Sequence, residues 1–129
     1  MSQRPLLDPT HVSPAVLDSM AAFHADILGQ VSSTVANHDV VVVGMAQNPV
    51  VKKARKALDA AGIPFEYLEY GSYFSQWKER LAIKMWSGFP TFPQVFVKGT
   101  LVGGNARLRA AIADGSFQAL LDGPRASGG

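Results

Sequence analysis

Asn48 and Pro49 form the junction of this sequence that is best suited to chemistry. Asn is a favoured N-cap, because its side-chain oxygen can accept a hydrogen bond from an amide in the first turn of a helix. Pro fits the first helical position, where its missing N–H is no loss. The remaining amides and the dipole of such a helix start attract anions. The sequence therefore predicts a helix start that can stabilise negative charge, with no reactive side chain in it.

The amino-acid composition excludes several kinds of chemistry. The 129 residues include no Cys, so this chain supplies no disulfide, no thiolate nucleophile and no cysteine ligand for zinc or an iron–sulfur cluster. No phosphate-binding glycine loop, serine-nucleophile motif or His-rich metal spacing occurs, and no metal site is predicted. A formal charge of +2 is too small to predict nucleic-acid binding.

The length and the ends of the chain predict one compact domain. We expect it to span residues 13–122, between a flexible N-terminal segment at residues 1–12 and a flexible tail at residues 123–129, because both ends are rich in Pro, Gly and Ser. No stretch approaches the roughly 20 apolar residues of a membrane span, and no basic start precedes an apolar core. The expectation is a soluble cytoplasmic protein with no membrane partner.

Hydrophobic periodicity predicts the elements around the junction. From residue 14, one long amphipathic helix is predicted. Its apolar stripe is Val16, Met20, Phe23, Ile27, Val31 and Val35. The uninterrupted β-branched run at residues 40–43 predicts a strand buried on both faces, and residues 65–69 predict a second strand. The helix that starts at Asn48 is expected to end at Gly62. Its buried residues are expected to be Val51, Ala54, Leu58 and Ala61.

The second half of the chain predicts a helix, a hairpin and a further helical region. The helix is expected over roughly residues 73–86. Its residues predicted to turn inward are Phe74, Trp77, Leu81 and Met85. Residues 94–97 and 100–102 flank a two-residue turn and predict a tight hairpin, after which residues 103–105 begin the last helical region. The apolar residues of that region are Leu108, Ala111, Ile112, Phe117, Leu120 and Leu121. The first two strands should be parallel, because a helix joins them, and the last two antiparallel, so an α/β sheet is predicted.

Three motifs within this order resemble the glutaredoxin branch of the thioredoxin fold. Phe-Pro-Thr-Phe-Pro-Gln at residues 89–94 looks like the family's segment around a cis proline. Val-Lys-Gly-Thr-Leu-Val-Gly-Gly at residues 97–104 is similar to the family's hairpin and double glycine. Arg-Leu-Ala-Ile-Lys at residues 80–84, which ends seven residues before Thr91, looks most like the monothiol glutaredoxins.

The resemblance covers roughly residues 25–121 and implies a fold. Each motif alone is weak evidence for the fold, whereas all three together, in order and at matching separations, are strong evidence for it. The implied architecture is a thioredoxin-like, glutaredoxin-type α/β domain: a four-stranded mixed sheet flanked by helices, here with an extra N-terminal helix.

The same resemblance implies that thiol chemistry is missing. The family's cysteine motif falls on residues 48–51, with Asn48 at the nucleophile position. The Asn can keep the helix cap, but an amide side chain is neither nucleophilic nor oxidisable. No catalytic residue is therefore assigned, and an active thiol–disulfide oxidoreductase is not expected. Iron–sulfur carriage is disfavoured for the same reason, and no cofactor is required.

The resemblance also implies a place for glutathione. Lys84 would meet the glycine carboxylate, the backbone of Phe92 just before Pro93 would pair with the cysteinyl amide, and amides after Gly104 would meet the γ-glutamyl carboxylate. The residues predicted to bind glutathione are Lys84, Thr91, Phe92, Pro93, Gly104 and Asn105.

Two partners in the family's pattern are missing from this sequence. Where many members carry a Lys shortly before the Cys, this chain has Met45 or its neighbours. Where an Asp would meet the ligand's ammonium, it has Asn105 and Ala106. Each lost ion-pair partner costs on the order of 1–3 kcal/mol in a partly buried site, so weak binding is expected.

Three functions stay open at the level of sequence. The first is a redox-inactive protein that holds glutathione or a glutathione-bearing ligand. The second is a protein-interaction module that uses a basic helix face or an aromatic segment, which consists of Tyr67, Tyr70, Tyr73, Phe74 and Trp77. The basic face consists of Lys52, Lys53, Arg55 and Lys56, and the alternative interpretation is a face that is only solvated. The third is an enzyme that uses glutathione as a substrate without a protein thiol.

Overall fold

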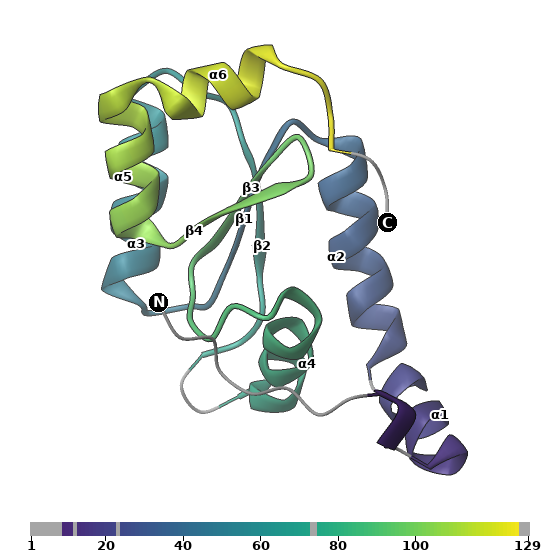
Figure 1. Cartoon of the computed structure of the whole chain (residues 1–129). Helices are drawn as coiled ribbons and strands as arrows, with labels where there is room; N and C mark the ends of the chain where they lie inside the picture. The colour runs from purple at the N-terminus through teal and green to yellow at the C-terminus, as the bar shows by residue number, and fades with distance from the viewer. Residues whose placement is uncertain (1–8, 12, 23, 73–74, 127–129) are drawn as a thin grey trace.

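The computed structural model describes residues 9–11, 13–22, 24–72 and 75–126 of the chain (Figure 1). The helices are η1 Pro9–His11, α1 Pro14–Ala22, α2 Ala25–Asn37, α3 Pro49–Ala60, α4 Trp77–Ser87, α5 Asn105–Asp114 and α6 Ser116–Asp122. The strands are β1 Val40–Gly44, β2 Glu66–Glu69, β3 Gln94–Val97 and β4 Thr100–Gly103. Within the described residues, no helix has the length and apolar character needed to cross a membrane.

The four strands form one mixed sheet in the order β2-β1-β3-β4. β1 runs parallel to β2 and antiparallel to β3, and β3 pairs antiparallel with β4. Val43 at the end of β1 lies opposite Gln94 at the start of β3, and Val95 lies opposite Gly103 at the end of β4. The sheet confirms the predicted four-stranded mixed sheet flanked by helices. Its register brings the end of β1, the start of β3 and the end of β4 to one edge.

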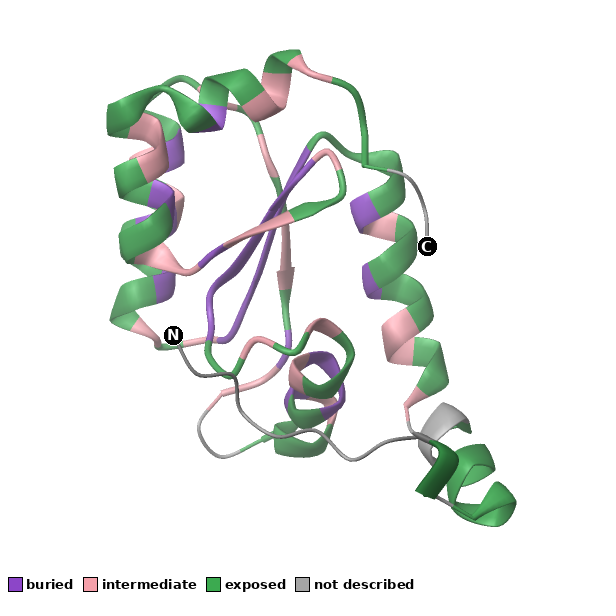
Figure 2. Cartoon of the chain, in the orientation of Figure 1, coloured by how far each residue is buried: buried purple, intermediate pink, exposed green. Residues whose placement is uncertain are grey.

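Helices cover both faces of this sheet (Figure 1). Alternate residues of the β1 valine run point to opposite faces, so both faces of the strand are buried (Figure 2). On the face covered by α2 and α4, the packed residues include Val31, Val35, Val41, Val43, Ile83 and Phe96. On the face covered by α3, α5 and α6, they include Val40, Val42, Leu58, Val95, Leu108 and Phe117. The sheet is therefore fixed from both sides.

The prediction of one long N-terminal helix from residue 14 is wrong in one respect, because the segment forms two helices, α1 and α2. His24, between α1 and α2, has a φ of 48°, a left-handed backbone conformation that cannot continue a right-handed helix. Val31 and Val35 in α2 are buried, whereas Val16 in α1 is 49% exposed. Phe23 lies outside the described residues. The core therefore uses the α2 half of the predicted stripe, and α1 is exposed where its side chains are described (Figure 2).

The predicted inward face of α4 is also wrong. Trp77, Leu81 and Met85 are 60%, 40% and 55% exposed, and the helix buries Arg80, Ala82 and Ile83 instead. A charged residue such as Arg80 is rarely buried, so the sequence did not predict burial of the face that carries it. In the fold, its guanidinium Nη1 donates to the backbone oxygens of Tyr70 and Ser75, so the Ile83 face can pack. The helix begins at Trp77 rather than near residue 73, and residues 73–74 lie outside the described part.

Glycines end the helices close to the predicted positions. α3 stops just before Gly62, whose φ is 70°, as predicted. Ala61, predicted to be buried, is exposed because it is already the C-cap of that helix. Gly115, with a φ of 84°, divides the last helical region into α5 and α6.

Residues 125 and 126 bond to the body of the domain. Arg125 Nη2 lies 2.9 Å from Asp39 Oδ1, and its Nη1 donates to the backbone oxygen of Val35. The Ala126 amide donates to the backbone oxygen of Lys98 at 2.8 Å. Of the other residues of the predicted flexible ends, 9–11 and 123–124 are described, whereas 1–8, 12 and 127–129 lie outside the described residues. The flexibility of both ends stays a prediction.

Candidate functional site

Asn48 caps α3 as predicted. Its Oδ1 accepts hydrogen bonds from the amides of Val50 at 2.9 Å and Val51 at 3.1 Å, and Pro49 occupies the first helical position. The Asn48 backbone is extended, with φ −98° and ψ 115°, as an N-cap requires. Its own side chain therefore satisfies two first-turn amides that would otherwise face an anion.

The loop before β3 lies at the same sheet edge as this cap. The peptide bond between Phe92 and Pro93 is cis, as predicted. A Cβ placed on Gly104 would lie 3.5 Å from the backbone oxygen of Pro93 and 3.8 Å from the ring of Phe89. The backbone at the start of α5 therefore packs directly on the cis-proline segment. The fold thus brings together Phe92, Pro93 and Gly104 from two separate motifs.

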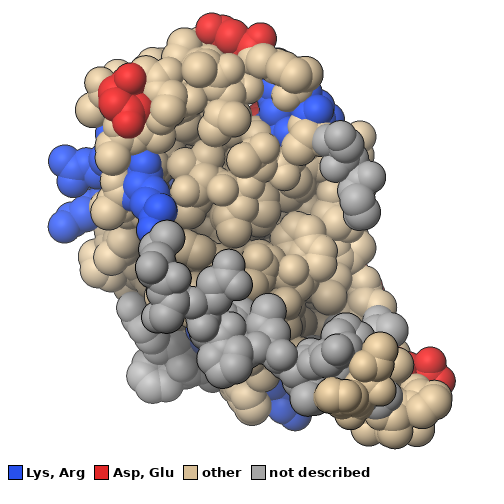
Figure 3. Space-filling model, in the orientation of Figure 1, with Lys and Arg blue, Asp and Glu red and all other residues tan. Residues whose placement is uncertain are grey.

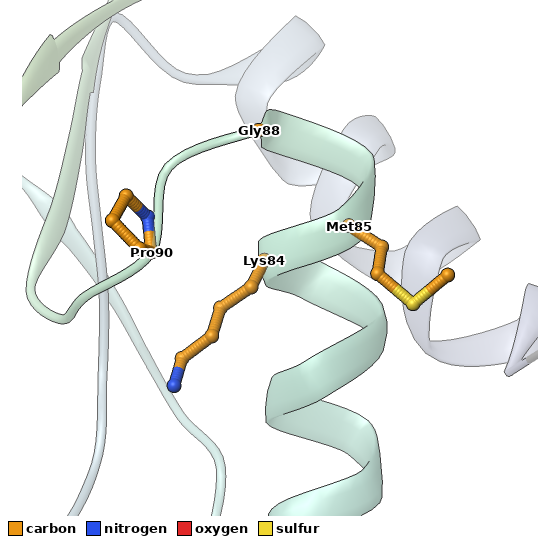
Figure 4. Close-up of a pocket in the computed structure, with 4 residues that line it drawn as sticks. All are labelled: Lys84, Met85, Gly88 and Pro90. Atoms are coloured by element: carbon orange, nitrogen blue, oxygen red, sulfur yellow. The ribbon is translucent and has the colours of Figure 1, made fainter. Parts of the chain in front are cut away.

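Lys84 extends from α4 towards this segment (Figure 4). Its Nζ lies 5.6 Å from the centroid of the Phe92 ring, within the range of a cation–π contact. The side chain lines a pocket of about 350 Å³ with Met85, Gly88 and Pro90. Figure 4 shows Lys84 and Met85 leaving the helix on different sides. No carboxylate of the described residues lies within salt-bridge distance of Lys84, so its ammonium is free to meet an external anion.

Asn105, the first residue of α5, carries an unsatisfied acceptor. Its Oδ1 is buried and has no hydrogen-bond partner within the described residues. The N-cap of this helix is Gly104, which makes no side-chain cap. A buried oxygen without a donor is unfavourable, and this atom has almost no surface through which a ligand could reach it. Thr91 is exposed beside the cis-proline segment.

The two positions that depart from the family's pattern provide no charge to the site. Met45 is 7% exposed and belongs to the core. Ala106 lies exposed in the first turn of α5. Neither position can replace a missing ion-pair partner. In the part of the chain that the structure describes, no group of three His, Cys, Asp or Glu side chains is arranged to hold a metal ion.

Gln94 is a positioning residue that sequence reasoning did not assign. It is fully buried, and its Nε2 donates to the backbone oxygen of Phe89 at 3.0 Å. This bond closes the loop that carries Pro93, while Gln94 Oε1 is buried without a partner among the described residues. The sequence feature that could have indicated this role is a polar residue, directly after Pro93, in an otherwise apolar strand.

Arg55 does not share the surroundings of the other basic residues on α3. Its guanidinium carbon lies 3.9 Å from the centroid of the Tyr67 ring, and the Tyr67 hydroxyl donates to Glu69 Oε1 at 2.9 Å. Burial, followed by the hydrogen bond and negative charge of Glu69, raises the pKa of Tyr67 above its ordinary value. Tyr67 therefore stays protonated at pH values at which a free tyrosine ionises, and its hydroxyl acts as a hydrogen-bond donor.

Known proteins share both the sequence and the fold. The sequence model of the family described as Glutaredoxin matches residues 40–102. A glutaredoxin-like protein of Dictyostelium discoideum is 58% identical over 82 residues, which are 64% of this chain and 67% of that protein. An uncharacterized monothiol glutaredoxin of Synechocystis is 37% identical over 65 residues, which are 50% of this chain and 58% of that protein.

Solved structures agree on the fold. The crystal structure of a buckwheat glutaredoxin–glutathione complex superposes with a TM-score of 0.65 at 21% identity, covering 75% of this chain and 88% of that one. At that identity the likeness shows the fold alone. The sequence matches show, in agreement with the sheet order, that this chain belongs to the glutaredoxin family. Because the chain contains no cysteine, it lacks the family's active-site cysteine.

Proposed function

We propose that this protein is inactive in thiol–disulfide exchange and weakly binds glutathione, or a ligand that carries glutathione, at the sheet edge near Lys84, Pro93 and Gly104. The observation that carries the proposal is the ammonium of Lys84 beside the cis-proline segment. Within the described residues it has no carboxylate partner, and it lies 5.6 Å from the centroid of the Phe92 ring at an open pocket.

Redox inactivity follows from the chemistry of Asn48. Thiol–disulfide exchange requires a thiolate to attack a disulfide sulfur and form a mixed disulfide. This chain has no sulfur atom that can do so, because its methionine thioethers form no disulfides. The Asn48 side-chain oxygen is already engaged by the amides of Val50 and Val51. The helix start is therefore retained as structure without its chemistry.

Glutathione has groups that match both ends of the edge. Its glycine carboxylate suits the ammonium of Lys84 in the open pocket. Its γ-glutamyl carboxylate suits the amides at the start of α5. The backbone of Phe92, just before the cis proline, offers main-chain hydrogen-bonding groups between them. The likeness to a glutaredoxin solved with glutathione supports this assignment.

The affinity is expected to be low. Met45 is buried and Ala106 has no polar side chain, so neither end of the ligand gains the additional ion pair seen in the family's pattern. The dissociation constant for glutathione is expected on the order of 0.1–10 mM. Heteronuclear NMR titration measures this range, and the shifts should centre on residues 84, 91–93 and 104–105. No shifts at 10 mM ligand would overturn the proposal.

A protein-interaction role is the second candidate, and the outer face of α4 favours it. Trp77, Leu81, Met85 and Trp86 are all at least 40% exposed, which is unusual for side chains of this size on one helix. Met85 also lines the pocket of Lys84, so a partner on this face would adjoin the candidate site. In the NMR titration, glutathione-induced chemical-shift changes at residues 84, 91–93 and 104–105, with none on the outer face of α4, would favour glutathione binding over this second role.

Wild-type protein should show no glutathione-dependent disulfide reductase activity. The physical reason is the missing thiol, since no residue can carry the mixed-disulfide intermediate. The measurement is reduction of a mixed disulfide of glutathione and a small thiol, coupled to glutathione reductase. Turnover well above the rate without protein would refute the prediction.

Lys84→Ala should weaken glutathione binding by about 1 kcal/mol or more, about fivefold, if the ammonium meets a ligand carboxylate. Lys78→Ala is the matched control, because Lys78 is an exposed cation on the same helix whose Nζ lies 5.7 Å from the Trp77 ring centroid. The control should bind glutathione like the wild type. Both variants should keep wild-type thermal stability. Equal binding by the two variants would remove Lys84 from the site.

A further inference from the structure

We propose that the groove between α3 and α5 binds an acidic segment of a partner protein. Lys53, Lys56 and Ala57 of α3 and Arg109 of α5 line a hollow of about 340 Å³. Figure 3 shows Lys and Arg side chains gathered on the side of the molecule where Figure 1 places these two helices. This surface is independent of the candidate glutathione site, and no residue is shared between them.

Helix packing creates the groove from positions far apart in the sequence. Ala54 and Leu58 of α3 and Leu108 of α5 are buried in one cluster, which fixes the two helices side by side. Arg109 follows Leu108 directly and is exposed, while Lys53 and Lys56 lie one turn apart on α3. Ala57 is small and leaves space between the cations. The hollow is therefore formed by the same contact that builds the core.

The charge of this surface is high and uncompensated. Together, α3 and α5 carry six of the 12 Lys and Arg residues and only two of the 10 Asp and Glu residues. Throughout the described ranges, no carboxylate lies within salt-bridge distance of Lys53, Lys56 or Arg109. Three like charges around one hollow repel one another, so an anionic occupant relieves a repulsion in the free protein.

The spacing favours several carboxylates over one compact anion. The cations project from the sides of two helices, and no helix start offers its free amides to the hollow. A single phosphate usually needs such converging donors, whereas an extended acidic segment can meet separate cations along its length. Single-stranded nucleic acid would need aromatic side chains for base stacking, and none of the described residues that line the groove is aromatic. A peptide rich in Asp or Glu is therefore the occupant that fits.

The probe for this proposal is a fluorescein-labelled oligoglutamate peptide, followed by fluorescence anisotropy with the full chain. Binding should weaken as salt rises, because screening shortens the range of exposed charges to about 10 Å at 0.1 M ionic strength. Lys56→Glu and Arg109→Glu should each weaken binding about fivefold or more. Since these two residues lie on different helices and are exposed, a folding defect in one variant leaves the other as a test.

Two controls carry the same change of net charge. Lys78→Glu on α4 lies away from the groove, and Lys52→Glu lies on α3 without lining it. Lys78→Glu should leave binding within about twofold of the wild type, and Lys52→Glu should weaken it less than Lys56→Glu does. An equal loss in all four variants would mean attraction to net charge alone and would overturn the proposal. Absence of binding at low salt, or displacement of the peptide by lower concentrations of inorganic phosphate or oligothymidylate, would also overturn it.

Discussion

Replacing Asn48 by Cys is expected to give a thiol whose pKa lies about one unit or more below the value of about 8.5 for a free cysteine. Asn48 occupies the N-cap of α3, where its side chain already accepts from the amides of Val50 and Val51. A thiolate at the same position would gain those amide donors and the positive end of the helix dipole. Its ionised form would therefore be favoured over its neutral form.

The chain offers a clean measurement of this effect, because each single variant contains one cysteine. The rate of iodoacetamide alkylation against pH reports the thiol pKa directly. Ala60→Cys is the matched control, since Ala60 is exposed at the opposite end of the same helix, where the dipole disfavours a negative charge. A thiol at position 48 that titrates no lower than the one at position 60 would show that the site is placed wrongly.

Arg80→Met is expected to destabilise the protein by about 2–4 kcal/mol. Arg80 is only 8% exposed, and its Nη1 donates to the backbone oxygens of Tyr70 and Ser75. Methionine matches much of the apolar length of the side chain but donates no hydrogen bond. Two carbonyls between β2 and α4 would lose their donor, and the cost of each depends on how far water can reach it.

Urea unfolding followed by circular dichroism measures this loss of stability. Lys78→Met is the matched control on the same helix, because Lys78 is exposed and its removal should change the free energy of unfolding by no more than about 0.5 kcal/mol. The Arg80 variant should also show faster amide exchange near residues 70–72. Equal stability of the two variants would mean that Arg80 does not support the fold.

Much of the fold was determined by local sequence signals. The valine run at residues 40–43 leaves little alternative to a strand buried on both faces, and Asn48 with Pro49 satisfies the requirements of a helix start without help from distant residues. The turn at residues 98–99 likewise fixes the hairpin of β3 and β4. These features could be predicted because the groups that satisfy them lie within a few residues along the chain.

The residues of the candidate site could be predicted in part, but the hydrogen bonding of its buried polar atoms could not. The motifs around Lys84, Pro93 and Gly104 predicted residues of the site, and the strand register places the last two at one edge of the sheet. That Asn105 Oδ1 lacks a donor and that Gln94 closes the loop are properties of buried surroundings. Spacing along the chain contains no information about which polar atoms find partners after packing.

Only the tertiary structure decided which surfaces face solvent. On α4, the sequence offered an apolar stripe at Trp77, Leu81 and Met85, but the fold buried the opposite face, where carbonyls of the loop before the helix accept hydrogen bonds from Arg80. The basic groove needed Arg109 and Lys56 to line one hollow, although they are more than 50 positions apart in the sequence. Local propensity can specify a helix and its ends, but the face that a helix buries depends on the free energy of packing against elements elsewhere in the chain.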